Sequence, residues 1–541
     1  MKNFKISYLL MLVATIIFSS CVKDLEVEPI DPNVSTANNV FKDPIAYKQA
    51  LAKIYASYAL SGQTGGGGGS PDIAGIDEGF GNYLRQLWGL QELSTDEAII
   101  AWDDATIKNF HWQTWAPNDV FIAALYSRIF YTISISNEFI RNANAAIANG
   151  ASGTFLTDLK AYKAEARFLR AFSYWHAIDM FGNVPFVTED DLPGAYFPER
   201  ITRSDLFNYI ESELIDMESD LVPARTNEYA RVDQAADWML LANLYLNAEV
   251  YTGQAKYTEA LTQINKVIAA GYTLESNYQN NFVADNDQST EIIFPIAFDG
   301  QNTQQYGGMT FLLHATSGGG MPLNGIDGGW GGIRTIQNFA SIFNVSESDF
   351  SNSDPEFTGI ADKRGMFYFN PDSWVYSISN VGTFTEGIGI TKFKNITSTG
   401  GDAPNAHPTF VSTDYPVFRL AEAYLMYAEA VVRGGSGGDM ATAVGYINQL
   451  RQRAYGDNSG DITAGDLDLD FLLDERAREL YWEGHRRTDL IRFGKFSGGS
   501  YIWEWKGNVQ AGTATDGYRD LYPIPSNDMN ANPNLIQNDG Y

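Results

Sequence analysis

The chain has 541 residues, of which 66 are acidic and 37 are basic, so its formal net charge at pH 7 is -29. A surface this acidic repels nucleic acid and anionic lipid headgroups, which argues against a phosphate-bearing partner. The single cysteine can form neither an internal disulfide nor a cysteine-based metal site, and a chain of this length buries enough apolar surface to fold without them.

The first 20 residues have the layout of a bacterial export signal. Lys2 and Lys5 precede an apolar run over 6–18, which is shorter than the roughly 20 residues of a membrane-spanning helix. Cys21 follows two small serines, as in a lipoprotein processing site, where the thiol is acylated and becomes the mature N-terminus. We therefore predict a lipoprotein signal peptide over 1–20 and a lipid anchor on Cys21. The alternative is a plain secretory peptide with an incidental cysteine.

Helical patterns dominate the next part of the chain. A glycine run within 61–72 predicts a loop, because glycine is costly in a helix. Long amphipathic patterns follow over 118–149 and 159–186, and Gly182 and Pro185 end the second one. These patterns predict long helices that cover a common core.

The stretch 235–271 resembles a tetratricopeptide (TPR) helix pair with a longer turn, because small residues on its first helix let the second lie close. The same pattern recurs over 418–454, and two further helical stretches, 161–181 and 471–483, fit the array. Such pairs stack because none can cover its apolar face alone. We therefore expect a mainly α fold with a scaffold of TPR-like helix pairs.

The segment 291–416 alternates glycine, aromatic and β-branched residues in short runs, which predicts a loop-rich insert with short β-strands. An irregular insert on a rigid helical scaffold is where binding residues usually lie. After the signal peptide we predict an N-terminal half over 21–290 with TPR-like helices and a C-terminal half over 291–541 with the binding insert. The two halves are expected to pack as one globular unit.

Catalytic motifs are weak in this sequence. The five histidines are scattered, and neither a zinc motif nor a phosphate loop is present. Glu475, Glu479 and Glu483 follow one another at a spacing of four on one predicted helix with arginines nearby. This arrangement suits a salt-linked structural face better than the acid and nucleophile of a glycosidase. We therefore predict no enzymatic activity and no required cofactor.

The acidic run "DNDQSTE" gathers several oxygen ligands within seven residues. Asp285 and Asp287 could hold a structural calcium ion there, although the run lacks the full spacing of an EF-hand. A solvated turn is the alternative interpretation.

Three large aromatic residues lie outside the helical patterns. Trp102, Tyr306 and Trp330 are in polar or glycine-rich segments, where a ring has no neighbouring helix to pack on. A flat ring beside glycines can stack on the apolar C–H face of a sugar while nearby polar groups bind its hydroxyls. Spacing alone leaves an equal alternative, in which these rings cap the local core.

Five sequence blocks resemble the signature blocks of the SusD/RagB family and arrive in family order. They are "AEARFLRAFSYWHAIDMFGNVPF", "FRLAEAYLMYAEA", "ERARELYWEGHRRTDLIRFG", "LYPIPSND" and "NPNLIQNDGY". The resemblance runs from Cys21 to Tyr541 and implies a SusD-like fold.

Members of this family are surface lipoproteins of Bacteroidetes that capture glycans. "VKDLEVEP" resembles the acidic leader that sends such lipoproteins to the outer face of the outer membrane. The resemblance therefore implies an extracellular position, membrane contact only through the lipid anchor, and a SusC-like TonB-dependent transporter as partner, for which family members act as a hinged lid.

A closer likeness is to the starch-binding founding member of the family, through "SPDIAGIDEG", "ELSTDEAIIAW", "YGGMTFL", "GMPLNG...GGW" and "EGIGITKFKN". It implies that Trp102, Tyr306 and Trp330 form an aromatic arc that cradles an α-glucan helix and that Arg85 binds a hydroxyl. Ile100 stands where the likeness has another tryptophan. The expected function is capture of starch-like α-1,4-glucan without chemistry. The alternatives are another glycan such as fructan, a glycan-degrading enzyme, and a protein-binding scaffold.

Overall fold

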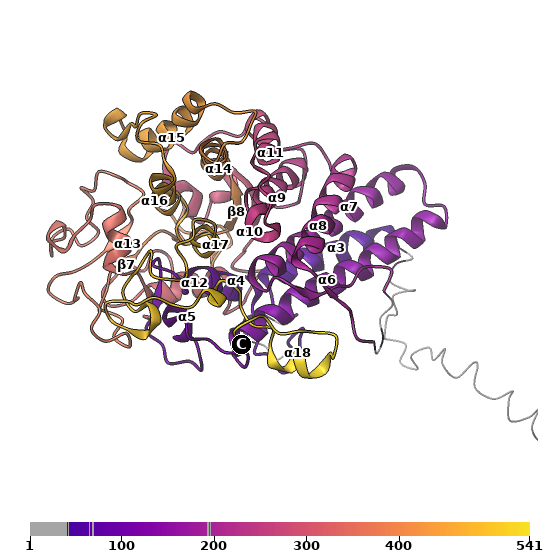
Figure 1. Cartoon of the computed structure of the whole chain (residues 1–541), viewed down its shortest axis with the longest axis horizontal. Helices are drawn as coiled ribbons and strands as arrows, with labels where there is room; N and C mark the ends of the chain where they lie inside the picture. Colours follow the sequence, from indigo (N-terminus) through magenta and orange to yellow (C-terminus); the bar gives the residue numbers. More distant parts are fainter. Residues whose placement is uncertain (1–40, 42, 64, 68–69, 192–193, 195) are drawn as a thin grey trace, which may run out of the picture. The chain divides into compact units, whose positions relative to one another are not determined.

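The computed structural model describes residues 41, 43–63, 65–67, 70–191, 194 and 196–541, and it is mainly α-helical (Figure 1). The chain divides into two units, 1–49 and 50–541. The described part of the first unit contains the start of helix α3 (Pro44–Ala59). Across the described residues, every helix is too short or too polar to span a bilayer. Cys21 and the predicted signal peptide lie outside the described residues, so the anchor stays a prediction, as does the division at residue 290.

Three long helices, α6 (Val120–Ala148), α7 (Gly153–Met180) and α8 (Arg203–Met217), lie side by side in the second unit, with α7 packed against both others (Figure 1). α6 begins at Asp119, whose carboxylate accepts hydrogen bonds from the backbone N–H groups of two first-turn residues. Such a cap contributes about 1 kcal/mol. α7 stops just before Gly182, whose backbone is left-handed at φ 71°, as the sequence predicted.

The TPR-like scaffold is formed by α9 (Gln234–Leu246), α11 (Tyr257–Ala269), α14 (Leu420–Val432), α15 (Met440–Tyr455) and α16 (Leu469–Leu480). α9 packs on α11, α11 on α14, and α14 on both α15 and α16. Nearly every residue of α9 and α14 is buried, because each lies between neighbours on more than one side. The stacked helix pairs predicted from the sequence are therefore confirmed. Among the described residues, the remaining α-helices outside the insert are α4 (Tyr83–Glu92), α5 (Asn109–Trp112), α10 (Ala248–Thr252), α17 (Arg486–Arg492) and α18 (Ser526–Ala531).

The strands are short, and they pair antiparallel. β4 (Ile292–Ile296) pairs with β8 (Tyr415–Arg419) at the two ends of the loop-rich insert. The other pairs are β1 (Ile99–Ile100) with β5 (Ile333–Arg334), β2 (Val184–Pro185) with β3 (Arg200–Ile201), and β6 (Phe367–Tyr368) with β7 (Gly389–Ile390). The sequence predicted short strands in the insert, and the structure confirms them. It did not predict which strands pair with one another.

The insert also contains two helices, α12 (Gly308–Thr316) and α13 (Gln337–Ile342), where the sequence predicted only loops and strands. Every residue of α12 is buried, so its sequence has no polar face and shows no helical period. A short, mostly apolar stretch of this length is compatible with either a strand or a helix. Packing against α4 decides in favour of the helix.

A buried ion network joins α16 to the end of β8. Arg419 lies 2.6 Å from carboxylate oxygens of both Glu479 and Glu483, and Arg364 lies 2.8 Å from Glu475. Burial raises the pKa of these carboxyls, but the surrounding arginines outweigh it. They hold the pKa of Glu475 at about 2 and lower those of Glu479 and Glu483. The predicted salt-linked face is confirmed.

One detail of that prediction was wrong. The helix ends at Leu480, and Trp482 follows with a left-handed backbone at φ 64°. Glu483 therefore lies beyond the helix, although its carboxylate still reaches the network and also pairs with Lys392 at 2.7 Å.

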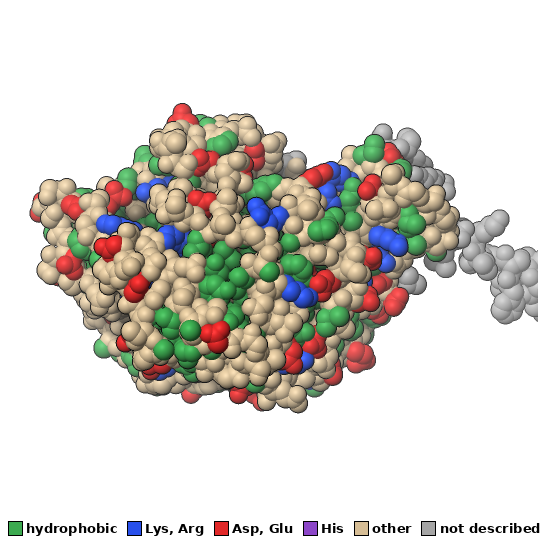
Figure 2. All heavy atoms as spheres, turned by 90° about the horizontal axis from the view of Figure 1, so that it is seen from above, with side chains coloured by type: hydrophobic (Ala, Val, Ile, Leu, Met, Phe, Trp, Pro, Cys, Tyr) green, Lys and Arg blue, Asp and Glu red, His purple; other side chains and the backbone are tan. Residues whose placement is uncertain are grey.

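Figure 2 shows one face of the molecule, on which hydrophobic side chains gather near the middle and acidic and basic side chains lie among neutral ones around them. The acidic side chains on this face are spread out, which keeps like charges apart in a chain of net charge -29.

Candidate functional site

The four predicted site residues come from four separate segments, and the structure brings them together in one cluster, in which Phe311 of α12 links Arg85 to Trp102. The guanidinium carbon of Arg85 lies 4.2 Å from the centre of the Phe311 ring, and the Trp102 ring centre lies 6.0 Å from it. Trp102 and Trp330 have ring centres 6.4 Å apart, and those of Trp330 and Tyr306 are 6.3 Å apart. With Phe311, four aromatic rings and one cation therefore form one continuous cluster.

The rings of this cluster are open to solvent to different degrees. Tyr306 is 41% exposed and Trp330 is 37% exposed, whereas Phe311, which contacts Trp102 and Arg85, is 1% exposed. The planes of Tyr306 and Trp330 differ by 45°, and those of Trp330 and Trp102 differ by 40°. Rings tilted from one to the next present a stepped surface, and their exposed faces can pack on apolar C–H groups.

The pairing of β1 with β5 positions Trp102. The N–H of Ala101 donates to the carbonyl of Gly332 at 2.8 Å, and the indole N–H of Trp102 donates to the carbonyl of Trp330 at 3.4 Å. A Cβ atom on Gly332 would lie 2.5 Å from Cε2 of Trp102, which is far inside van der Waals contact. Glycine at this position therefore allows the indole to lie flat against the backbone of the neighbouring strand.

His314 of α12 positions Trp330. The two rings are stacked, with centres 4.6 Å apart and planes 24° apart, and the backbone N–H of Trp330 donates to the carbonyl of His314 at 2.7 Å. The His314 side chain is fully buried, with Nδ1 2.6 Å from the carbonyl oxygen of Gly328 and Nε2 2.8 Å from that of Thr409. The exposed indole thus rests on a ring that is fixed on both sides.

Arg85 lies in the first turn of α4, whose N-cap Asn82 accepts the Arg85 backbone N–H at 3.0 Å. Burial lowers the pKa of Arg85 to about 10, and the charges of Asp104 and Asp77 oppose this shift. The side chain therefore remains protonated at neutral pH. Among the described residues no oxygen accepts a hydrogen bond from its guanidinium group, so its donors are available to a ligand.

Sequence analysis missed three contributors to this cluster. They are Phe311, His314 and Phe410, whose ring centre lies 5.3 Å from that of Tyr306. Buried apolar rings give no local signal that separates a binding site from a core, and His314 lies two residues beyond the block "YGGMTFL". Ile100, where the likeness has a tryptophan, is fully buried in β1 and adds no ring to the surface.

The predicted calcium ligands lie elsewhere. Both oxygens of Asp285 accept hydrogen bonds from Ser398, one from its backbone N–H and one from its hydroxyl, each at 2.7 Å. Asp287 is exposed and accepts from Gln288 at 2.6 Å. Within the part of the chain that the structure describes, no three His, Cys, Asp or Glu side chains converge as a metal site would require. Calcium binding at Asp285 and Asp287 stays a prediction.

Two family models match the chain, one described as "SusD family" over residues 290–541 and one as "Starch-binding associating with outer membrane" over residues 85–246. The "Starch-binding protein SusD" of Bacteroides thetaiotaomicron is 36% identical to this chain, and the match covers 97% of this chain and 96% of that protein. This chain belongs to the SusD family. The "SusD-like protein P2" of Formosa agariphila, a further SusD relative, is 25% identical over the full length of both proteins.

Solved structures of SusD-type proteins share the fold. A SusD superfamily protein from Bacteroides vulgatus matches with a TM-score of 0.68 at 22% identity, over 92% of this chain and 99% of the other. The "Surface glycan-binding protein A" of Bacteroides fluxus matches with a TM-score of 0.66 at 20% identity, over 94% of this chain and all of the other. The mainly α, SusD-like fold predicted from the sequence blocks is therefore confirmed.

Proposed function

We propose that this chain is a cell-surface lipoprotein that captures starch-like α-1,4-glucan and passes it to a SusC-like TonB-dependent transporter. The observation that carries the proposal is the series of tilted rings of Tyr306, Trp330 and Trp102, with the guanidinium group of Arg85 in the same cluster. Tyr306 and Trp330 are exposed to solvent, and Trp102 is half-buried. The likeness to the starch-binding protein SusD over nearly the whole chain supports the choice of glycan.

Recognition follows from shape. An α-1,4-glucan is naturally curved, so its sugar rings can meet successive tilted aromatic faces without first being bent, and the preformed curve reduces the entropy lost on binding. Each stacked ring contributes about 1 kcal/mol, and Arg85 adds hydrogen bonds to hydroxyls. The sum corresponds to dissociation constants in roughly the micromolar to millimolar range. Such affinity suits a protein that must release its ligand to a transporter.

Binding without chemistry is part of the proposal. A glycosidase needs one carboxyl that is protonated at working pH, and the buried carboxyls of Glu475, Glu479 and Glu483 have lowered pKa values because arginines or a lysine hold them. Incubation of the protein with amylose should release no reducing ends. Release in proportion to protein concentration would contradict this part of the proposal.

Titration calorimetry with maltoheptaose and inulin tests the ligand class. We expect heat with maltoheptaose and none with inulin, because the fructan lacks the curved pyranose path that the tilted rings match. Binding of inulin alone would reassign the substrate to fructan. If neither glycan binds while the protein still recovers a transporter in a pull-down, the protein-binding scaffold becomes the better interpretation.

A further inference from the structure

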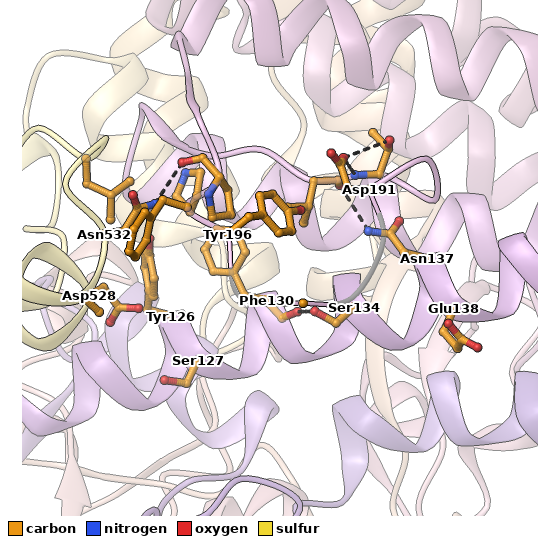
Figure 3. Close-up of a pocket in the computed structure, with 18 of the residues that line it drawn as sticks. Tyr126, Ser127, Phe130, Ser134, Asn137, Glu138, Asp191, Tyr196, Asp528 and Asn532 are labelled. Carbon is orange, nitrogen blue, oxygen red and sulfur yellow. Dashed lines mark hydrogen bonds between the residues drawn. The ribbon is translucent and has the colours of Figure 1, made fainter. Parts of the chain in front are cut away.

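A pocket of about 550 Å³ lies away from the aromatic site and shares no described lining residue with it (Figure 3). It is formed by α6, by described residues between Pro185 and Pro198, and by the C-terminal segment that starts with α18. This volume is in the range of pockets that bind small molecules. Nothing in the proposed function uses it.

The middle of this pocket is aromatic. The rings of Phe130 and Tyr196 lie between the polar groups at its two ends (Figure 3). Tyr196 is 44% exposed and its neighbour Phe197 is 57% exposed, which is unusual for large apolar side chains. An occupant with an apolar face could cover these rings and remove their surface from water.

One end of the pocket carries a buried hydroxyl without a partner. Tyr126 is only 2% exposed, and its hydroxyl has no hydrogen-bond partner among the described residues. Asp528 lies beside it (Figure 3), and burial raises the pKa of both groups. A buried hydroxyl left without a partner destabilises the folded protein, because it has lost its hydrogen bonds to water. A ligand that brings its own hydroxyl groups would remove this cost.

The charged groups at the other end are already paired. Arg141 forms an ion pair with Glu138 and donates to the carbonyl oxygens of Glu189 and Asp191 at 3.0 and 2.9 Å. The Asp191 carboxylate accepts the backbone N–H of Thr188 at 2.9 Å. Arg141 is the only basic residue among the described lining residues, so no free cation is present there to hold a phosphate or carboxylate ligand.

These observations restrict the chemistry of the occupant. It must be small, carry no negative charge, have an apolar face for the rings, and present hydroxyl groups to Tyr126 and Asp528. An apolar peptide side chain would cover the rings but leave the Tyr126 hydroxyl without a partner. A pyranose ring meets all of these requirements, because its C–H face is apolar and its hydroxyls donate and accept.

We propose that this pocket is a second sugar site, in which one or two pyranose rings stack on Phe130 and Tyr196 and bond Tyr126 and Asp528 through their hydroxyls. The proposed function is needed only to choose the sugar used as probe. A second site of this kind would let one protein hold a short oligosaccharide apart from the glucan segment that lies on the exposed rings.

Saturation-transfer NMR with maltotriose tests the inference on the full chain carrying Trp330→Ala, which weakens the first site. We expect saturable binding to remain. Addition of Tyr126→Phe should weaken it at least threefold, and addition of Tyr196→Ala at least tenfold. The matched control is Tyr209→Phe, because the hydroxyl of Tyr209 on α8 is also buried without a partner but does not line the pocket. The control should leave the residual binding unchanged.

The inference is overturned if the Trp330→Ala chain shows no saturable binding, or if neither Tyr126→Phe nor Tyr196→Ala changes what remains. An equal loss with Tyr209→Phe would also overturn it. Failure of the proposed function is distinguishable, because Trp330→Ala alone would then leave maltotriose binding at the wild-type level. If Tyr196→Ala removed all binding in that case, the pocket would be the sugar site and the exposed rings would not be.

Discussion

Replacement of Trp330 by alanine tests whether this ring binds glucan or caps the core. The side chain is 37% exposed and rests on His314, so its removal deletes one stacking face and leaves the buried support in place. Loss of one central stacking contact should weaken maltoheptaose binding at least tenfold, which is about 1.4 kcal/mol. Removal of a fully buried tryptophan costs about 3–5 kcal/mol of stability. Removal of a ring as exposed as that of Trp330 should destabilise the protein less than this, so we expect the melting temperature to fall by only about a few degrees.

Calorimetry gives the affinity in this experiment, and circular dichroism gives the melting temperature. Trp238→Ala is the matched control, because this half-buried tryptophan of α9 donates to Glu218 at 2.8 Å and lies outside the aromatic cluster. It should change the melting temperature by a similar amount and leave the affinity unchanged. If Trp330→Ala binds within twofold of wild type, the stacking argument is wrong. If the variant unfolds, the ring belongs to the core.

Three further predictions test the anchor, the site geometry and the buried charges. Cys21→Ala should release the protein from membranes with its glucan affinity intact, and continued membrane attachment would show that the tether is misidentified. Gly332→Ala should weaken glucan binding at least threefold, because the new Cβ displaces the Trp102 indole, whereas Gly328→Ala, with nothing within 4 Å of its Cβ, should not. Burial raises the pKa of Glu92 to about 7, so its contribution to stability is complete below its unfolded value of 4.5 and is lost as the pH rises through 7. Around Glu475 the arginines outweigh burial and hold the pKa at about 2, so its contribution is present above 4.5 and lost, by roughly 3 kcal/mol, as the pH falls toward 2. We therefore expect the melting temperature to be highest near pH 5, and a steady rise from pH 5 to 8 would contradict this assignment.

Helices that cover a core on one side could be predicted from the sequence, because their apolar residues repeat with the helical period. The long patterns before Gly182 and the two TPR-like pairs are examples, and their ends follow from glycine and from capping residues. α12 could not be predicted, because a helix buried on every side has no periodic pattern. The end of α16 before Glu483 also depends on tertiary packing, since nothing local forbids another turn.

For the candidate site, the sequence by itself determined which rings were unusual. Trp102, Tyr306 and Trp330 lie where no local helix can bury them, and the family likeness added Arg85. Only the tertiary structure decided that they meet, because β1 and β5 pair over two residues each and are more than 200 positions apart in the chain. Such short strands have no register signal of their own, and the packing of α12 on α4 joins the same two parts of the chain. The supporting roles of Phe311 and His314 could be recognised only in the tertiary structure. In the sequence, a buried residue beneath a binding surface looks the same as one in any core.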